Sequence, residues 1–140
     1  MADAPVIGIL VGSESDRERM EDATKALDEA GVAYEFEVRS AHRTPGAVAE
    51  YAQTARGRGL KVLICGAGLS AALPGAVAAH TDLPVIGVPL RSKLSVLDGL
   101  DALLAIAQMP PGTPVATVGV DNARNAAALA LRILGVTDAL

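Results

Sequence analysis

The stretch Val6-Ile7-Gly8-Ile9-Leu10-Val11 is followed directly by the polar stretch Gly12-Ser13-Glu14-Ser15-Asp16. The first stretch has no polar side chain, whereas a strand with one wet face would alternate. Continuous apolar runs are typical of parallel strands that helices cover on both faces. Ser15 and Glu18 have the S-x-x-E spacing of a capping box, which predicts that a helix starts in the second stretch.

The rest of the chain repeats this order of strand and helix. Further strands are predicted at residues 33–38, 61–65, 84–88 and 114–119, and helices at 15–30, 45–56, 71–79, 101–108 and 123–134. Alternation at this spacing predicts right-handed βαβ units and a parallel sheet. We expect an α/β fold, a flavodoxin-like three-layer αβα sandwich with a parallel five-stranded sheet in the order 2-1-3-4-5. The second strand alternates in polarity and is expected near a sheet edge.

Length and composition narrow the class of protein. The 140 residues suit one domain, so we take residues 1–140 as a single domain. Hydrophobic residues make up 51% of the chain but aromatic ones only 2%, so the core must consist of small aliphatic side chains. Alanine-rich helices with little polar surface favour burial against another subunit, and we expect a homo-oligomer.

Charge and cysteine content exclude several functions. The net charge is −4 with both signs interspersed, which argues against a nucleic-acid-binding protein. One cysteine and two histidines argue against a zinc site. Residues 62–81 lack charged side chains other than histidine, but glycines and prolines interrupt them, so we expect no membrane span there. The first residues lack the basic region of a signal peptide, and a soluble, cytoplasmic protein is expected.

Three predicted loops carry the candidate chemistry, since ligands of open α/β sheets bind at the carboxyl ends of the strands. In the first loop, backbone N–H groups at a helix start, with the hydroxyls of Ser13 and Ser15, suit a phosphate. Asp16 can accept hydrogen bonds from ribose hydroxyls. The alternative is that Ser15 and Asp16 only cap the helix.

The second loop is Ser40-Ala41-His42-Arg43-Thr44-Pro45, after the second strand. Arg43 can hold a phosphate with two parallel hydrogen bonds. His42 can give and take a proton within one turnover, because the pKa of imidazole is ordinarily near neutrality. A surface histidine in an ordinary turn is the alternative, although such a residue does not require Ser40 and Arg43 beside it.

The third loop, residues 66–75, has so few side chains that backbone amides can approach a flat ring or small neutral molecule. Tight helix–strand packing is the alternative. Outside the loops, Cys65 is expected in the core. His80 is expected as a cation at a helix C-terminus. Residues 91–93 either reach an anionic group or form a solvated loop.

Five groups of residues lie in order over nearly the whole chain: Gly12-Ser13-x-Ser15-Asp16; Ser40-Ala41-His42-Arg43-Thr44-Pro45; Gly66-Ala67-Gly68 with Leu73-Pro74-Gly75; Leu83-Pro84-Val85-x-Gly87-Val88-Pro89; and Gln108-Met109-Pro110 with Pro114-Val115-Ala116-Thr117. With these groups the chain resembles the N5-carboxyaminoimidazole ribonucleotide mutase family of purine biosynthesis (phosphoribosylaminoimidazole carboxylase catalytic subunit type). The resemblance implies an isomerase without cofactor or metal, usually an octamer, that converts N5-carboxyaminoimidazole ribonucleotide to 4-carboxyaminoimidazole ribonucleotide.

The resemblance also implies a role for each site residue. The carbamate of the small-molecule substrate would lose CO2, the CO2 would stay trapped, and C4 of the ring would attack it. His42 would be the catalytic proton shuttle. The substrate-binding residues would be Ser13, Ser15, Ser40 and Arg43 at the phosphate, Asp16 at the ribose, and Ala67, Gly68 and Leu73 around the base and CO2.

The chain departs from the family pattern in several places. Ala72 stands where the bacterial branch normally has histidine, which could favour direct use of CO2, as in the aminoimidazole ribonucleotide carboxylases of animals. Arg17 replaces a common aromatic residue, the loop 91–97 is slightly long, and many relatives carry an additional C-terminal helix. Two alternatives to the mutase therefore stay open: a carboxylase that takes CO2 directly, and a non-catalytic nucleotide-binding homologue.

Overall fold

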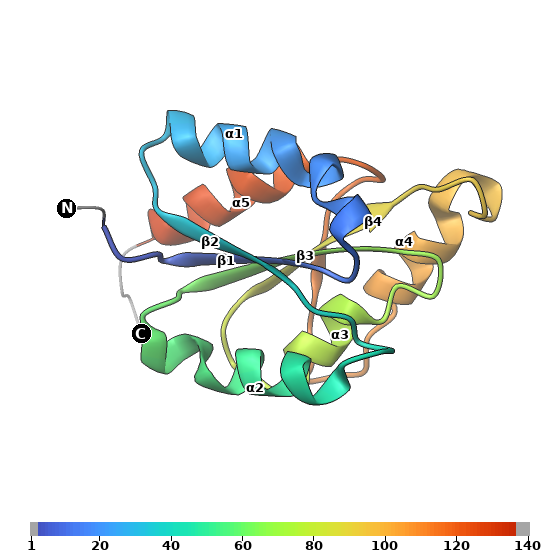
Figure 1. The fold of residues 1–140 in the computed structure, drawn as a ribbon, viewed down its shortest axis with the longest axis horizontal. Coiled ribbons are helices and arrows are strands. Elements are labelled where there is room, and N and C mark those ends of the chain that lie inside the picture. Colours follow the sequence, from blue (N-terminus) through green and yellow to red (C-terminus); the bar gives the residue numbers. More distant parts are fainter. Residues whose placement is uncertain (1–2, 137–140) are drawn as a thin grey trace.

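A parallel five-stranded sheet forms the centre of the molecule (Figure 1). The structure, a computed structural model, describes residues 3–136. The strands lie in the order β2-β1-β3-β4-β5, which confirms the predicted fold class and strand order. Their bounds are β1 Ile7–Val11, β2 Tyr34–Val38, β3 Val62–Gly68, β4 Val85–Leu90 and β5 Ala116–Thr117.

Helices cover both faces of the sheet, α1 and α5 on one face and α2, α3 and α4 on the other (Figure 1). The α-helices are α1 Glu21–Glu29, α2 Pro45–Ala55, α3 Leu73–Ala78, α4 Leu100–Ala107 and α5 Ala123–Leu134. Short 3-10 turns are η1 Glu14–Asp16, η2 Glu18–Met20, η3 Arg56–Arg58 and η4 Leu97–Gly99. Among the described residues, no helix is both long and apolar enough to cross a membrane.

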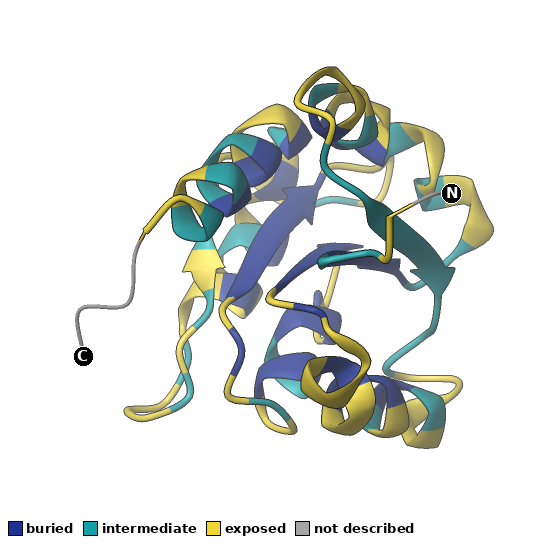
Figure 2. Cartoon of the chain, turned by 90° about the vertical axis from the view of Figure 1, so that its left-hand side faces the viewer, coloured by how far each residue is buried: buried dark blue, intermediate teal, exposed yellow. Residues whose placement is uncertain are grey.

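The sheet separates two layers of core. Ile7, Ile9 and Val11 of β1 face α1 and α5, while Leu10 faces α2 and α3, as expected for side chains that alternate along a strand. Every residue of β1 and β4 is buried, which explains why their sequences are continuous apolar runs. In Figure 2 the edge strand β2 is only half-buried, as its alternating sequence predicted.

The predicted capping box after β1 is wrong. Residues 14–20 form two 3-10 turns instead of an α-helix, and neither turn has a side-chain cap. The Ser15 hydroxyl lies 2.9 Å from the Ser13 hydroxyl. Burial of the Met20 side chain against β3 determines the path of this segment, and the α-helix begins only at Glu21. Of the helix predicted at residues 15–30, only Glu21–Glu29 is α-helical, and Ala30 after it is exposed.

The extents of two strands also differ from the prediction. β3 continues through Gly66 to Gly68, because these residues pair with Val88–Leu90 of β4 rather than forming a turn. β5 is reduced to two residues, Ala116 and Thr117, paired with β4. Pro114 has no N–H to donate to a ladder, so the predicted start of this strand cannot pair fully.

Gly87, in the middle of β4, offers a test of the close packing between sheet and helices. A Cβ atom there would clash with Ile106 of α4 and lie 3.1 Å from Val115 and 3.4 Å from Pro74. We expect Gly87→Ala to lower the free energy of unfolding by about 1–3 kcal/mol, the usual cost of overpacking. Urea unfolding measures the change. Gly57→Ala is the control, since nothing lies within 4 Å of that position; an equal loss in both variants would contradict the packing argument.

Candidate active site

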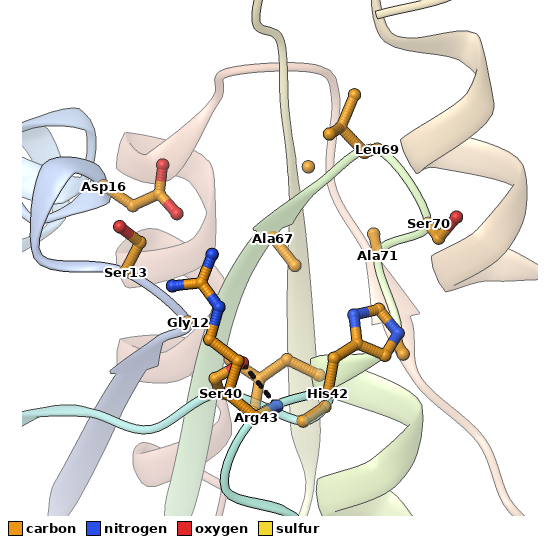
Figure 3. A pocket seen from close by; sticks show the side chains of 14 residues that line it. Gly12, Ser13, Asp16, Ser40, His42, Arg43, Ala67, Leu69, Ser70 and Ala71 are labelled. Atoms are coloured by element: carbon orange, nitrogen blue, oxygen red, sulfur yellow. Dashed lines mark hydrogen bonds between the residues drawn. The ribbon is translucent and has the colours of Figure 1, made fainter. Parts of the chain in front are cut away.

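A pocket of about 240 Å³ opens at the carboxyl edge of the sheet, where the loops after β1, β2 and β3 meet (Figure 3). Its lining comes from three segments: Gly12, Ser13 and Asp16; Ser40, Ala41, His42 and Arg43; and Ala67, Gly68, Leu69, Ser70, Ala71, Ala72 and Leu73. Of the residues predicted for the site, all except Ser15 line this pocket. The structure therefore brings the three predicted loops together.

Hydrogen bonds between its two ends hold the β2–α2 turn in shape. The N–H of Ser40 donates to Thr44 Oγ1 over 3.1 Å, and that hydroxyl donates to the Ser40 carbonyl over 3.1 Å. The N–H of Thr44 also donates to the Ser40 carbonyl, over 2.8 Å. Pro45 then starts α2 at the first helical turn, where it loses no hydrogen bond.

The turn directs His42 and Arg43 to different parts of the pocket. The Arg43 guanidinium points toward the loop that carries Ser13 and Asp16 (Figure 3). The His42 ring lies at the other end, beside Ala71 (Figure 3). The pocket thus has a charged end and an end that combines imidazole with small apolar groups. Both side chains are on exposed residues and can reach a molecule that enters from solvent.

The β1–α1 segment supplies the polar groups of the charged end. Ser13 and Asp16 are half-buried and line the pocket, whereas Ser15 is exposed and only contacts the Ser13 hydroxyl. Burial raises the pKa of the Asp16 carboxyl, and the positive charge of Arg19 lowers it. The N–H of Asp16 is already bonded to the Ser13 carbonyl, at 3.0 Å. Because no α-helix begins here, an anion at this end meets side chains and not the N-terminus of a long helix.

The third side of the pocket is formed by glycine and alanine residues together with Leu69, Ser70 and Leu73. A Cβ atom at Gly68 would lie 2.8 Å from the carbonyl oxygen of Leu90, so only glycine fits between β3 and β4 here. Leu69 follows in the left-handed conformation, with φ 55°, and is exposed at the rim. Leu69 and Ser70 belong to the predicted third loop, residues 66–75, but no role was predicted for either. Their position after a parallel strand was the signal that pointed to them.

The other residues considered from sequence lie outside the pocket. Cys65 is buried in the core, as predicted, and burial raises the pKa of its thiol. His80 lies just beyond α3, 3.5 Å from the amide nitrogen of Gln53. Residues 91–93 are exposed, and Arg91 contacts Asp121 of the same chain through its backbone N–H, at 2.9 Å, and its Nε, at 3.6 Å. Among residues 3–136, no three His, Cys, Asp or Glu side chains are grouped as a metal site would need.

Comparison with known proteins identifies the family. Residues 6–140 match the family model described as AIR carboxylase. The chain belongs to this AIR carboxylase family. Its relatives include the N5-carboxyaminoimidazole ribonucleotide mutases of Pyrococcus horikoshii and Bacillus subtilis. Each is 56% identical to this chain, over 96% of its length. The match covers 75% of the Pyrococcus horikoshii protein and 83% of the Bacillus subtilis protein. The phosphoribosylaminoimidazole carboxylase of Schizosaccharomyces pombe is also 56% identical, over 94% of this chain and 24% of its own length.

A solved structure of a similar protein has the same fold as this chain. The crystal structure of Treponema denticola PurE superposes with a TM-score of 0.80 at 33% identity. The match covers 96% of this chain and 82% of the other. The family and the fold predicted from the sequence are both confirmed.

Thr44 tests how much the site depends on the β2–α2 turn. We expect Thr44→Val, which keeps the shape but removes the hydroxyl, to lower the free energy of unfolding by about 1 kcal/mol through the lost hydrogen bonds. Activity should fall by about tenfold or more, because the turn positions two groups of the site. Denaturant unfolding and steady-state kinetics measure both effects. Thr54→Val removes a hydroxyl bonded within α2 and should leave activity unchanged.

Proposed function

We propose that the protein is an N5-carboxyaminoimidazole ribonucleotide mutase of purine biosynthesis. The observation that carries this proposal is the order of groups along one pocket: the Asp16 carboxylate and Arg43 guanidinium at one end, and the His42 imidazole beside small apolar groups at the other. A ribonucleotide substrate has matching parts, since it carries a phosphate, a ribose and a base. The mutases among the relatives support the same assignment.

In this proposal the charged end binds the phosphate and ribose. The Ser40 hydroxyl accepts a hydrogen bond from the N–H of Arg43, at 3.1 Å, so its own proton is left to donate to a phosphate oxygen. Ser13 donates beside it, and Ser15 acts by orienting the Ser13 hydroxyl. The Arg43 guanidinium supplies the positive charge with two parallel donors. Asp16 accepts the hydrogen bonds of the ribose hydroxyls.

The opposite end holds the base and the CO2. Ala67 and Leu73 are buried, and Gly68 has no side chain, so a flat ring can lie against the backbone of β3. Few polar groups here compete with the imidazole for the reacting atoms. An apolar surface also displaces water, which protects a CO2 molecule that must not escape between the two steps.

The proposed reaction needs one group that gives a proton and takes one back. The bond between N5 and the carboxyl carbon breaks, CO2 leaves, and the nitrogen takes a proton from the His42 imidazolium. C4 then forms a bond to the CO2 carbon and loses its own proton to the now neutral imidazole. The histidine ends in its initial state, so the reaction is an isomerisation with no net consumption of protons.

A carboxylase that takes CO2 directly is the second candidate. Ala72 lines the pocket as an exposed residue and adds no polar group for a carboxylate, and one relative is a phosphoribosylaminoimidazole carboxylase. The two candidates differ in substrate. Purified protein should convert N5-carboxyaminoimidazole ribonucleotide at a rate that bicarbonate does not change. Turnover of aminoimidazole ribonucleotide that requires added bicarbonate, without turnover of the carbamate, would identify the carboxylase. Binding without turnover of either would identify a non-catalytic protein.

We further propose that the protein works as a cytoplasmic octamer. Large apolar side chains are exposed around the β4–α4 loop, including Leu94, Val96 and Leu97, at 77%, 60% and 75%. Contiguous exposed apolar side chains are typical of surfaces that another protein covers. Light scattering on the purified protein measures the number of subunits.

His42→Asn tests the proposed proton transfer. Asparagine keeps a polar group of similar reach but cannot carry a proton, so kcat should fall by about 10²–10⁴-fold, the usual contribution of general acid–base catalysis. Binding of the product ribonucleotide, measured by calorimetry, should change little because the phosphate and ribose contacts lie elsewhere. A variant with wild-type kcat would remove His42 from the mechanism.

A further inference from the structure

Asp121 lies in the loop between β5 and α5 and is held by two arginines from other loops. Its Oδ1 atom is 2.9 Å from Nη2 of Arg19, and its Oδ2 atom is 3.6 Å from Nε of Arg91. In the part of the chain that the structure describes, it is the one carboxylate that pairs with two arginines. None of these three residues lines the pocket.

The backbone at Asp121 is also anchored to a neighbouring strand. The residue has the left-handed conformation, with φ 59°, which aspartate tolerates better than most residues. Its N–H donates to the carbonyl of Pro89 over 2.8 Å, and its Oδ1 accepts the N–H of Arg91 over 2.9 Å. Asp121 is therefore anchored to the end of β4 and presents a carboxylate of fixed direction to Arg19.

Arg19 belongs to the same segment as Ser13 and Asp16, which the proposed function assigns to phosphate and ribose. It lies three residues after Asp16, in the second of two 3-10 turns that have no side-chain cap. Hydrogen bonds in 3-10 turns have poorer geometry than those in α-helices, so such a segment depends on contacts from outside. Contacts of this kind include Met20, which is buried over Gly66, Arg17, whose guanidinium lies 4.4 Å from the centroid of the Phe36 ring, and Arg19, which is paired to Asp121.

Arg19 also acts on Asp16 through its charge. Burial raises the pKa of the Asp16 carboxyl, and Arg19 is the group whose charge opposes this effect. Arg43 and His42 line the same pocket from the β2–α2 turn; the Arg43 guanidinium points toward Asp16, and the His42 ring lies at the other end (Figure 3). Arg17, although next to Asp16 in sequence, is bonded to Glu14 over 2.6 Å.

We propose that Arg19 and Asp121 are positioning residues for Asp16: Asp121 holds the Arg19 guanidinium in place, and this ion pair fixes the segment of 3-10 turns that carries the ribose-binding carboxylate. The proposal rests on the proposed function, because it assigns Asp16 to a ribose. It adds two residues from outside the pocket to the machinery of substrate binding. One of them belongs to a loop, between β5 and α5, that contributes no lining residue.

Arg19→Gln and Asp121→Asn test the proposal, since both keep the approximate shape and remove the charge. We expect Arg19→Gln to raise KM for the ribonucleotide by about tenfold, the effect of losing one charge-assisted hydrogen bond, with kcat within about twofold. Asp121→Asn should raise KM in the same direction. The double variant should be no worse than Arg19→Gln alone, because Asp121 acts through Arg19.

The pH profile separates positioning from a merely structural effect. Without the arginine charge the pKa of Asp16 rises further, so the carboxylate takes up its proton at a higher pH. The acidic limb of kcat/KM should therefore move to higher pH in Arg19→Gln and return toward the wild-type position in Arg19→Lys, which keeps the charge. Thermal unfolding of each variant shows whether the fold is retained.

Arg17→Gln is the matched control, because it removes the same charge from the same segment but leaves the contact with Asp121; the Arg17 guanidinium pairs with Glu14 and lies over the Phe36 ring instead. It should leave KM and the acidic limb unchanged. An unchanged KM in Arg19→Gln, an equal effect in Arg17→Gln, or additive effects in the double variant would overturn the proposal.

The wild-type protein separates this test from that of the proposed function. If the wild-type protein does not convert N5-carboxyaminoimidazole ribonucleotide, the proposed function fails. The variants are then compared by their dissociation constants for ribose 5-phosphate instead of by KM. The same order of variants in these constants would support the role of Arg19 and Asp121, and a different order would overturn it. A wild-type protein that binds neither compound would reject both proposals.

Discussion

The structure depends on the close approach of helices to a sheet that has glycines at the points of contact. Tyr51 of α2 fills the space over Gly8, Met20 lies over Gly66, and Ile106 of α4 lies over Gly87. A side chain at any of these glycines would push its neighbour away from the sheet. The near absence of aromatic residues from the chain has the same origin, since helices this close leave room mainly for alanine, valine, leucine and isoleucine.

This packing is also what assembles the site. Met20 holds the segment with Ser13 and Asp16 at the sheet edge, while Pro45 and the bonds of Thr44 fix the turn with His42. The three loops come from strands that are neighbours in the sheet, so groups far apart in sequence meet in one pocket. The loop after β1 contributes a carboxylate and a hydroxyl, the loop after β2 a guanidinium and an imidazole, and the loop after β3 mainly backbone and small apolar groups.

Most of the architecture could be predicted from the sequence, because buried parallel strands are continuous apolar runs. The grouping of the site loops could be predicted as well, because the carboxyl ends of parallel strands lie at one edge of the sheet. The 3-10 turns after β1 could not, since the local capping signal at Ser15 is outweighed by the burial of Met20 against a distant glycine. The pair of Arg19 with Asp121 was equally hidden, because 102 residues separate its members and neither belongs to a motif. Local patterns do not encode contacts of this kind.

The pocket is lined mainly by loops that lie outside the two core layers, which bears on how substrate preference can change in this family. Ala72 is exposed at the rim of the pocket, outside both layers of the core. Under the proposed function, another side chain at this position would meet the bound carboxylate or CO2, while the buried residues of both layers would keep their contacts. Substitutions at position 72 can therefore accumulate in evolution with little loss of stability. The same fold can then serve both mutases and carboxylases, which are both found among the relatives.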